Sequence, residues 1–160
     1  MQLRLALLIS PLLLSFAQGQ EIKDGQFPVT SNLKAGVAKI DITPPDAAAV
    51  TLVGHVRKVT GVRDPLRAGV LVLDDGETKA AIVTMDTNGA WEDMVRDARA
   101  RIERESGVPA ANILISAAHN HSGPGYLENM RWAADLIQKL GDAAKQAASN
   151  MKPVSVGYSE

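Results

Sequence analysis

Two histidines, His119 and His121, stand two positions apart directly after an apolar run at residues 112–116. The run is typical of a buried strand, in which alternate side chains share one face. If the extended backbone continues past the run, both imidazoles lie on that face and converge on one point. Neutral imidazole is the commonest nitrogen ligand of zinc, so the pattern predicts a metal site at a strand end. The alternative is a pair of ordinary surface or core histidines, because a bare His-x-His is a weak signal.

The residues after the histidines favour a sharply turning loop. Ser-Gly-Pro-Gly at residues 122–125 ends the strand and lets the backbone turn. Ser122 lacks the surroundings of a nucleophile elbow, so a loop that lets the backbone approach a ligand is the better interpretation. The third histidine, His55, is either a pocket residue or a structural or solvated side chain. Asp41 precedes Thr-Pro-Pro, which is typical of turn chemistry.

The segment at residues 119–125, His-Asn-His-Ser-Gly-Pro-Gly, resembles the His-Thr-His-Ser-Gly-Pro-Gly signature of the neutral/alkaline non-lysosomal ceramidases. Three more segments resemble that family in the same order: the Gly-x-x-x-x-Asp-Ile-Thr-Pro strand within residues 35–45, the segment at residues 61–68, and the strand ending in aspartate at residues 81–86. The resemblance covers residues 33–160. Asn120 departs from the usual threonine, and an Ala-Ala pair precedes the motif where Gly-Thr is usual. These departures indicate a divergent member.

The resemblance implies a zinc site and assigns roles to its residues. His119 is the expected zinc ligand, and His121 is expected to be catalytic, contacting the substrate or the developing oxyanion. Asp86, at the end of an apolar strand, is a candidate to orient a ligand histidine through its other ring nitrogen, the alternative being a strand-end cap. In the family a further histidine, a glutamate and a tyrosine complete the site far beyond the motif, and none of them maps onto this chain.

The implied function is a zinc-dependent hydrolase that cleaves the N-acyl amide bond of ceramide or a related lipid amide, giving a fatty acid and an amine. Family members are several times longer, so the chain is expected to be a truncated, N-terminal portion of the catalytic domain, inactive by itself. Two alternatives remain open. One is a catalytically inactive exported binding or structural fragment. The other, which Asn120 keeps open, is a hydrolase of another amide or ester on the same scaffold.

Charge and composition limit the partners. The formal net charge is −1, so no basic surface for nucleic acid is expected. The expected partner is a ceramide-like lipid amide, with peripheral membrane contact through that substrate. The sequence predicts no particular oligomeric state.

The first residues predict export. Residues 1–19 resemble a secretory signal peptide, with Arg4 followed by a Leu-rich stretch that is short for a membrane span. The alternative is a retained anchor. Residues 20–32 are polar and read as a linker. The chain has no cysteine and therefore no disulfide framework. The expected location is secreted or periplasmic.

The hydrophobic pattern predicts an α/β fold, specifically a mixed sheet with a βαβ unit and a β-hairpin, with helices packed on the sheet, forming a partial domain. Residues 80–85 are nearly continuously apolar, which favours a strand covered on both faces. Asp and Gly at residues 74–78 favour a hairpin turn. The predicted strands are residues 36–42, 50–53, 69–73, 79–85, 112–117 and 153–158, and the predicted helices are residues 91–106 and 127–150.

Overall fold

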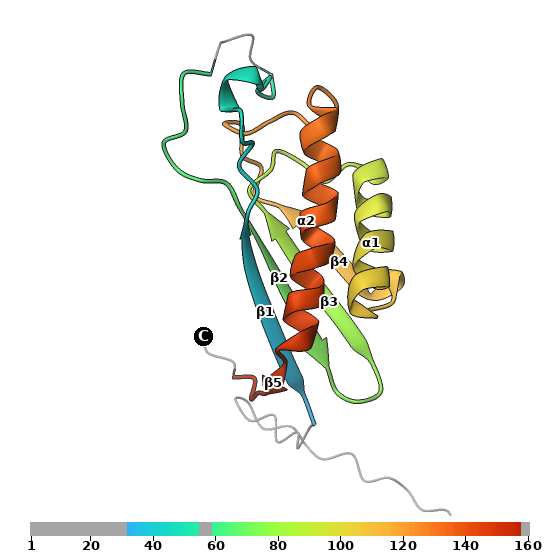
Figure 1. Ribbon diagram of the computed structural model, residues 1–160. Coiled ribbons are helices and arrows are strands. Elements are labelled where there is room, and N and C mark those ends of the chain that lie inside the picture. The colour runs from blue at the N-terminus through green and yellow to red at the C-terminus, as the bar shows by residue number, and fades with distance from the viewer. Residues whose placement is uncertain (1–31, 55–58, 158–160) are drawn as a thin grey trace, which may run out of the picture. The chain divides into compact units, whose positions relative to one another are not determined.

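The computed structural model describes residues 32–54 and 59–157, which form a mixed sheet with two helices on one face (Figure 1). The predicted signal peptide, most of the predicted linker and His55 lie outside the described residues. No helix in the described part is long and apolar enough to cross a membrane. The elements are β1 (Lys34–Asp41), the 3-10 turn η1 (Ala47–Ala49), β2 (Arg67–Asp74), β3 (Lys79–Met85), α1 (Glu92–Ser106), the 3-10 turn η2 (Ala110–Asn112), β4 (Ile113–Ala117), α2 (Met130–Ser149) and β5 (Lys152–Pro153).

The strand order is β4-β3-β2-β1-β5, with β3 and β4 parallel and the other neighbours antiparallel. The predicted mixed α/β fold is therefore confirmed. The β2–β3 hairpin and the β3-α1-β4 unit are both present. The hairpin turns where the Asp75 carboxylate accepts the N–H groups of Glu77 and Thr78, and Gly76 takes a φ of 94°.

The core lies between the sheet and the two helices. Its strand residues alternate along each strand, and α2 supplies a stripe that includes Leu136, Leu140 and Ala144. β1 and α2 approach so closely that a Cβ atom at Gly36 would collide with the backbone carbonyl of Ala147. This contact requires glycine at position 36.

One prediction about the sheet was wrong, and it concerns the face opposite the helices. β3 was expected to be covered on both faces, but Ile82 and Thr84 are exposed while Ala81, Val83 and Met85 are buried. Both helices pack on the same face (Figure 1), so the described residues leave the other face open. The register aligns four apolar side chains across that open face, namely Val37, Leu71, Ile82 and Leu114.

Three boundaries also differ from the prediction. The segment at residues 50–53 contributes only an isolated bridge between Leu52 and Pro124. α2 begins at Met130 instead of residue 127, and β5 has two residues where a strand over 153–158 was expected. Two of these segments bond to other loops, since Val53 N–H donates to Gly123 O at 3.4 Å and Val154 N–H donates to Leu33 O at 3.0 Å, and sequence periodicity does not encode such bonds.

Neighbouring positions on β4 test the one-sided burial. Ile113 is 1% exposed and Leu114 is 56% exposed. We expect Ile113→Ala to lower the free energy of unfolding by about 2–5 kcal/mol, because it leaves a cavity in the core. Leu114→Ala should cost less than about 1 kcal/mol, because that side chain already faces solvent. Urea denaturation measures both, and equal losses would contradict the open face.

Candidate functional site

The loops that follow β3 and β4 lie side by side at one edge of the sheet. The parallel pairing continues beyond both strands, since Ala118 N–H donates to Met85 O at 2.9 Å and Asn120 N–H donates to Thr87 O at 3.0 Å. Thr87 is buried, and its hydroxyl donates to Gly89 O at 3.1 Å. Hydrogen bonds therefore hold the loop that carries the histidines against the loop that follows β3.

The two predicted histidines meet. His119 Nε2 and His121 Nε2 are 3.2 Å apart, and the rings stand edge to face with centroids 4.8 Å apart. Both side chains are exposed. The two rings therefore converge as expected, and the Nε2 atom of each ring faces that of the other.

The route to this convergence differs from the expected one. β4 ends at Ala117, so the extended backbone does not continue to the histidines. His119 instead has a φ of 60°, and it is the one non-glycine residue of the described chain with positive φ. The chain turns at residues 121–122 and bends at Gly123, as the sequence predicted, although neither Gly123 nor Gly125 has positive φ. A left-handed conformation such as that of His119 costs about 1–3 kcal/mol and concentrates at functional sites.

A backbone carbonyl orients His119. Nδ1 of His119 lies 2.9 Å from Asn88 O, and a carbonyl only accepts, so Nδ1 carries the proton. Nε2 of the neutral ring then carries an electron pair, which accepts from His121 Nε2–H at 3.2 Å here and is what a metal ligand needs. Asp86 had been the candidate for this orienting contact. Its carboxylate instead accepts the Arg67 N–H at 2.8 Å, which is the strand-end alternative.

The donor set fits zinc in part. Two nitrogens on one tetrahedral zinc ion lie about 3.3 Å apart, because each Zn–N bond is about 2.0–2.1 Å long. The observed 3.2 Å between the Nε2 atoms agrees with that spacing. Within residues 32–54 and 59–157, however, no group of three or more histidines, aspartates or glutamates is placed to hold a metal. The described residues thus bring two imidazole nitrogens together without a third candidate ligand.

Asn129 fastens the far end of the histidine loop. Its Nδ2 donates to Thr51 O at 2.8 Å and to Gly125 O at 2.7 Å, and its Oδ1 accepts the Thr51 N–H at 3.1 Å. The sequence analysis missed Asn129 and Asn88. An asparagine before a helix suggests an N-cap, but Asn129 makes no cap bond and ties two loops together instead. Asn88 acts through its backbone carbonyl, for which the sequence carries no signal.

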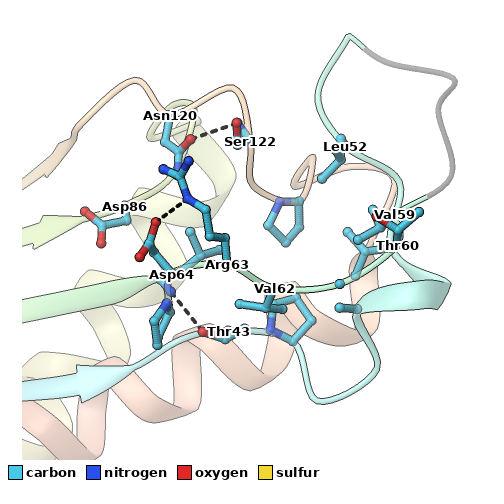
Figure 2. A pocket seen from close by; sticks show the side chains of 17 residues that line it. Thr43, Leu52, Val59, Thr60, Val62, Arg63, Asp64, Asp86, Asn120 and Ser122 are labelled. Atoms are coloured by element: carbon cyan, nitrogen blue, oxygen red, sulfur yellow. Dashed lines mark hydrogen bonds and ion pairs between the residues drawn. The ribbon is translucent and has the colours of Figure 1, made fainter.

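A cavity of about 700 Å³ is lined by Asn120 and Ser122, the two residues that flank His121 in the sequence (Figure 2). Aliphatic residues such as Leu52 and Val62 form much of its wall, and Arg63, Asp64 and Asp86 add charged groups; neither His119 nor His121 is among the residues that line it. The turn expected at Asp41 borders the same region. The Asp41 carboxylate accepts the Thr43 N–H at 2.8 Å, and hydrogen bonds from the Thr43 side chain and from this N–H lower the pKa of Asp41.

Solved structures share this fold. A crystal structure of neutral ceramidase from Pseudomonas aeruginosa matches 77% of the chain with a TM-score of 0.67 and 21% sequence identity. The structure of a ceramidase complexed with C2 gives the same values. The fold is similar to that of a neutral ceramidase segment. The match spans 22% of the length of each of those chains. No protein-family model matches the sequence, and comparison with curated proteins gives no significant match. The resemblance inferred from the motifs is therefore confirmed as a likeness of fold.

Substitutions at His119 test its left-handed backbone. Both His119→Gly and His119→Ala lose the bond to Asn88 O, but only glycine adopts positive φ without strain. We expect the glycine variant to be more stable than the alanine variant by about 1 kcal/mol. At Ser116, which lies in β4, the order should reverse, because glycine weakens a strand. Thermal unfolding of the four variants measures this, and alanine above glycine at position 119 would contradict the assignment.

Tyr126 gives a pH-dependent test of the loop. It is buried and stacks on Trp91 with ring centroids 5.6 Å apart. Burial raises the pKa of the Tyr126 phenol above 10.0, and Asp97 and Asp93 raise it further. The neutral phenol is thus favoured in the folded state, so this contribution to stability is complete below pH 10 and is lost as pH rises through the folded pKa.

The chain has two tyrosines, so a Tyr158→Phe variant isolates Tyr126. We expect its absorbance at 295 nm to titrate at higher pH in the folded protein than in denaturant. Equal midpoints in the two states would show that Tyr126 is solvated.

Proposed function

We propose that this chain forms part of a zinc-dependent hydrolase of the neutral ceramidase type, which cleaves the N-acyl amide bond of ceramide or a related lipid amide to give a fatty acid and an amine. The observation that carries the proposal is the 3.2 Å approach of the two Nε2 atoms, with Nδ1 of His119 held by the Asn88 carbonyl. The likeness of fold to solved ceramidases supports it.

The proposed roles follow from the hydrogen bonds. His119 holds zinc through Nε2, because its Nδ1 is engaged with Asn88 O, which fixes the orientation of the ring. When bound, zinc polarises a carbonyl group and makes a water molecule more acidic. His121 presents Nε2 at the same point, where it contacts the substrate or donates to an oxygen that gains negative charge. A catalytic role for Asp86, which lines the neighbouring cavity, stays a prediction.

We place the remaining zinc ligands in a longer protein, of which this chain would be a part. The family site uses a further histidine, a glutamate and a tyrosine, and the described residues hold no third ligand. We therefore propose weak zinc binding by this segment and no turnover of N-acyl lipids by it alone. The lack of a third ligand also keeps open a second candidate, an exported binding fragment without catalysis. Export itself is proposed from residues 1–19.

Zinc titration tests the proposal. We expect one zinc ion per chain to shift the imidazole C–H signals of His119 and His121 in NMR spectra of the metal-free protein. His55 is the third histidine of the chain and serves as the internal reference. Replacing both site histidines by glutamine should abolish saturable zinc binding measured by titration calorimetry, whereas His55→Gln should leave both the binding and the shifts of the two site imidazoles unchanged.

Zinc that binds equally well to the double variant would contradict the assignment. If the wild-type chain binds zinc, hydrolysis of N-acylsphingosine is the next assay. Turnover above the uncatalysed rate by the 160-residue chain would show that the site is complete without further ligands.

A further inference from the structure

Asn88 is the one asparagine of the chain that precedes a glycine, and it lies in the bend that follows β3. Because glycine has no Cβ atom, the side-chain amide of Asn88 can approach the backbone nitrogen of Gly89 closely. Every other asparagine precedes a leucine, an isoleucine, a histidine or a methionine, whose side chain obstructs the same approach. The Asn88-Gly89 pair is therefore where an asparagine amide and the next backbone nitrogen meet with the least steric hindrance.

Neither of these two groups is engaged within residues 32–54 and 59–157. Asn88 bonds there through its backbone carbonyl, which lies 2.9 Å from His119 Nδ1, and Gly89 bonds through its carbonyl, which accepts from the Thr87 hydroxyl at 3.1 Å. No described residue bonds the Asn88 side chain or the Gly89 N–H. By contrast, the amide of Asn129 makes three hydrogen bonds. Asn88 is also half-buried, so water reaches it.

A free asparagine amide beside a free glycine nitrogen undergoes intramolecular deamidation. The Gly89 nitrogen gives up its proton to solvent and attacks Asn88 Cγ. A bond forms between these atoms, the bond from Cγ to Nδ2 breaks, and Nδ2 leaves as ammonia. The product is a five-membered succinimide ring, which water then opens. Cleavage between Cγ and the Gly89 nitrogen gives aspartate, and cleavage between the former backbone carbonyl carbon and that nitrogen gives isoaspartate.

We propose that Asn88 is a site of spontaneous deamidation, and that its conversion to isoaspartate frees His119 from the carbonyl that orients it. In isoaspartate the main chain runs through Cγ, and the former carbonyl carbon ends in a carboxylate beside the chain. The oxygen that faces His119 Nδ1 is then no longer fixed by the peptide bond to Gly89. In aspartate the carbonyl stays in the main chain and keeps this contact. The inference goes beyond the proposed function, because it requires neither zinc nor a substrate.

Peptide mass mapping of the native chain, incubated at mildly alkaline pH, tests the site of reaction. We expect the Asn88 amide to be lost first, while the other asparagines keep theirs. Synthetic peptides with aspartate or isoaspartate at position 88 identify the two products by their chromatographic retention.

The Gly89→Ala variant is the matched control. A Cβ atom at position 89 would lie 3.4 Å from the Trp91 ring, which is an ordinary contact, and Gly89 does not have positive φ, so the variant should keep the fold. We expect it to deamidate at Asn88 at least about tenfold more slowly, because the added carbon hinders the attack.

The nitrogen chemical shifts of the His119 ring test the consequence. We expect them to move away from their native values as isoaspartate accumulates, because Nδ1 loses its fixed acceptor. Freshly prepared Asn88→Asp carries the new negative charge on an unaltered main chain. Its His119 ring should therefore keep Nδ1 protonated, as in the native chain.

Four results would overturn the inference. The first is a native chain that keeps the Asn88 amide while the chain unfolded in urea loses it, since the fold would then protect the pair. The second is a Gly89→Ala variant that deamidates as fast as the wild-type chain. The third is the absence of isoaspartate among the products. The fourth is an unchanged His119 ring in protein that carries isoaspartate at position 88.

Discussion

The parallel pairing of β3 with β4 constrains every part of the candidate site. In a parallel pair the carboxyl ends of both strands reach the same edge of the sheet, so the loops that follow them must meet. Here the ladder continues into the loops through the bonds from Ala118 to Met85 and from Asn120 to Thr87. The histidine loop is therefore held along its backbone. The imidazoles project from a fixed support, which reduces the conformational entropy lost when they bind a common partner.

The left-handed backbone of His119 determines how the imidazoles are placed on this support. A strand that continued would have placed the rings on one face at the spacing of alternate residues. The left-handed residue instead precedes a turn at residues 121–122, and the Nε2 atoms lie within hydrogen-bond distance while Nδ1 lies 2.9 Å from Asn88 O. Local strain and ring orientation are thus properties of the same residue. The hydrogen bonds of Asn120 and Ser122, one and three positions further along, hold the loop that contains this residue.

Much of the fold was predictable because it depends on local patterns. The Asp-Gly turn predicted the hairpin, and the helix predicted at residues 91–106 is α1, Glu92–Ser106. The chemistry of Asp41 was also predicted from the Thr-Pro-Pro that follows it. The convergence of the histidines was predicted from the alternation of side chains along a strand. This reason was wrong, because β4 ends at Ala117, before the histidines. The rest lay beyond sequence reasoning, because the carbonyl of Asn88 and the side chain of Asn129 act across 31 and 78 positions of chain.

The apolar row of Val37, Leu71, Ile82 and Leu114 has a thermodynamic consequence. Val37 is 65% exposed and Leu114 is 56% exposed, so part of the hydrophobic surface of this sheet remains in water after folding. A partner layer that covers this face would bind the native state and not the unfolded chain, and it would raise stability by mass action. The free energy of unfolding of the isolated chain is therefore smaller than that of the same residues when such a layer covers them.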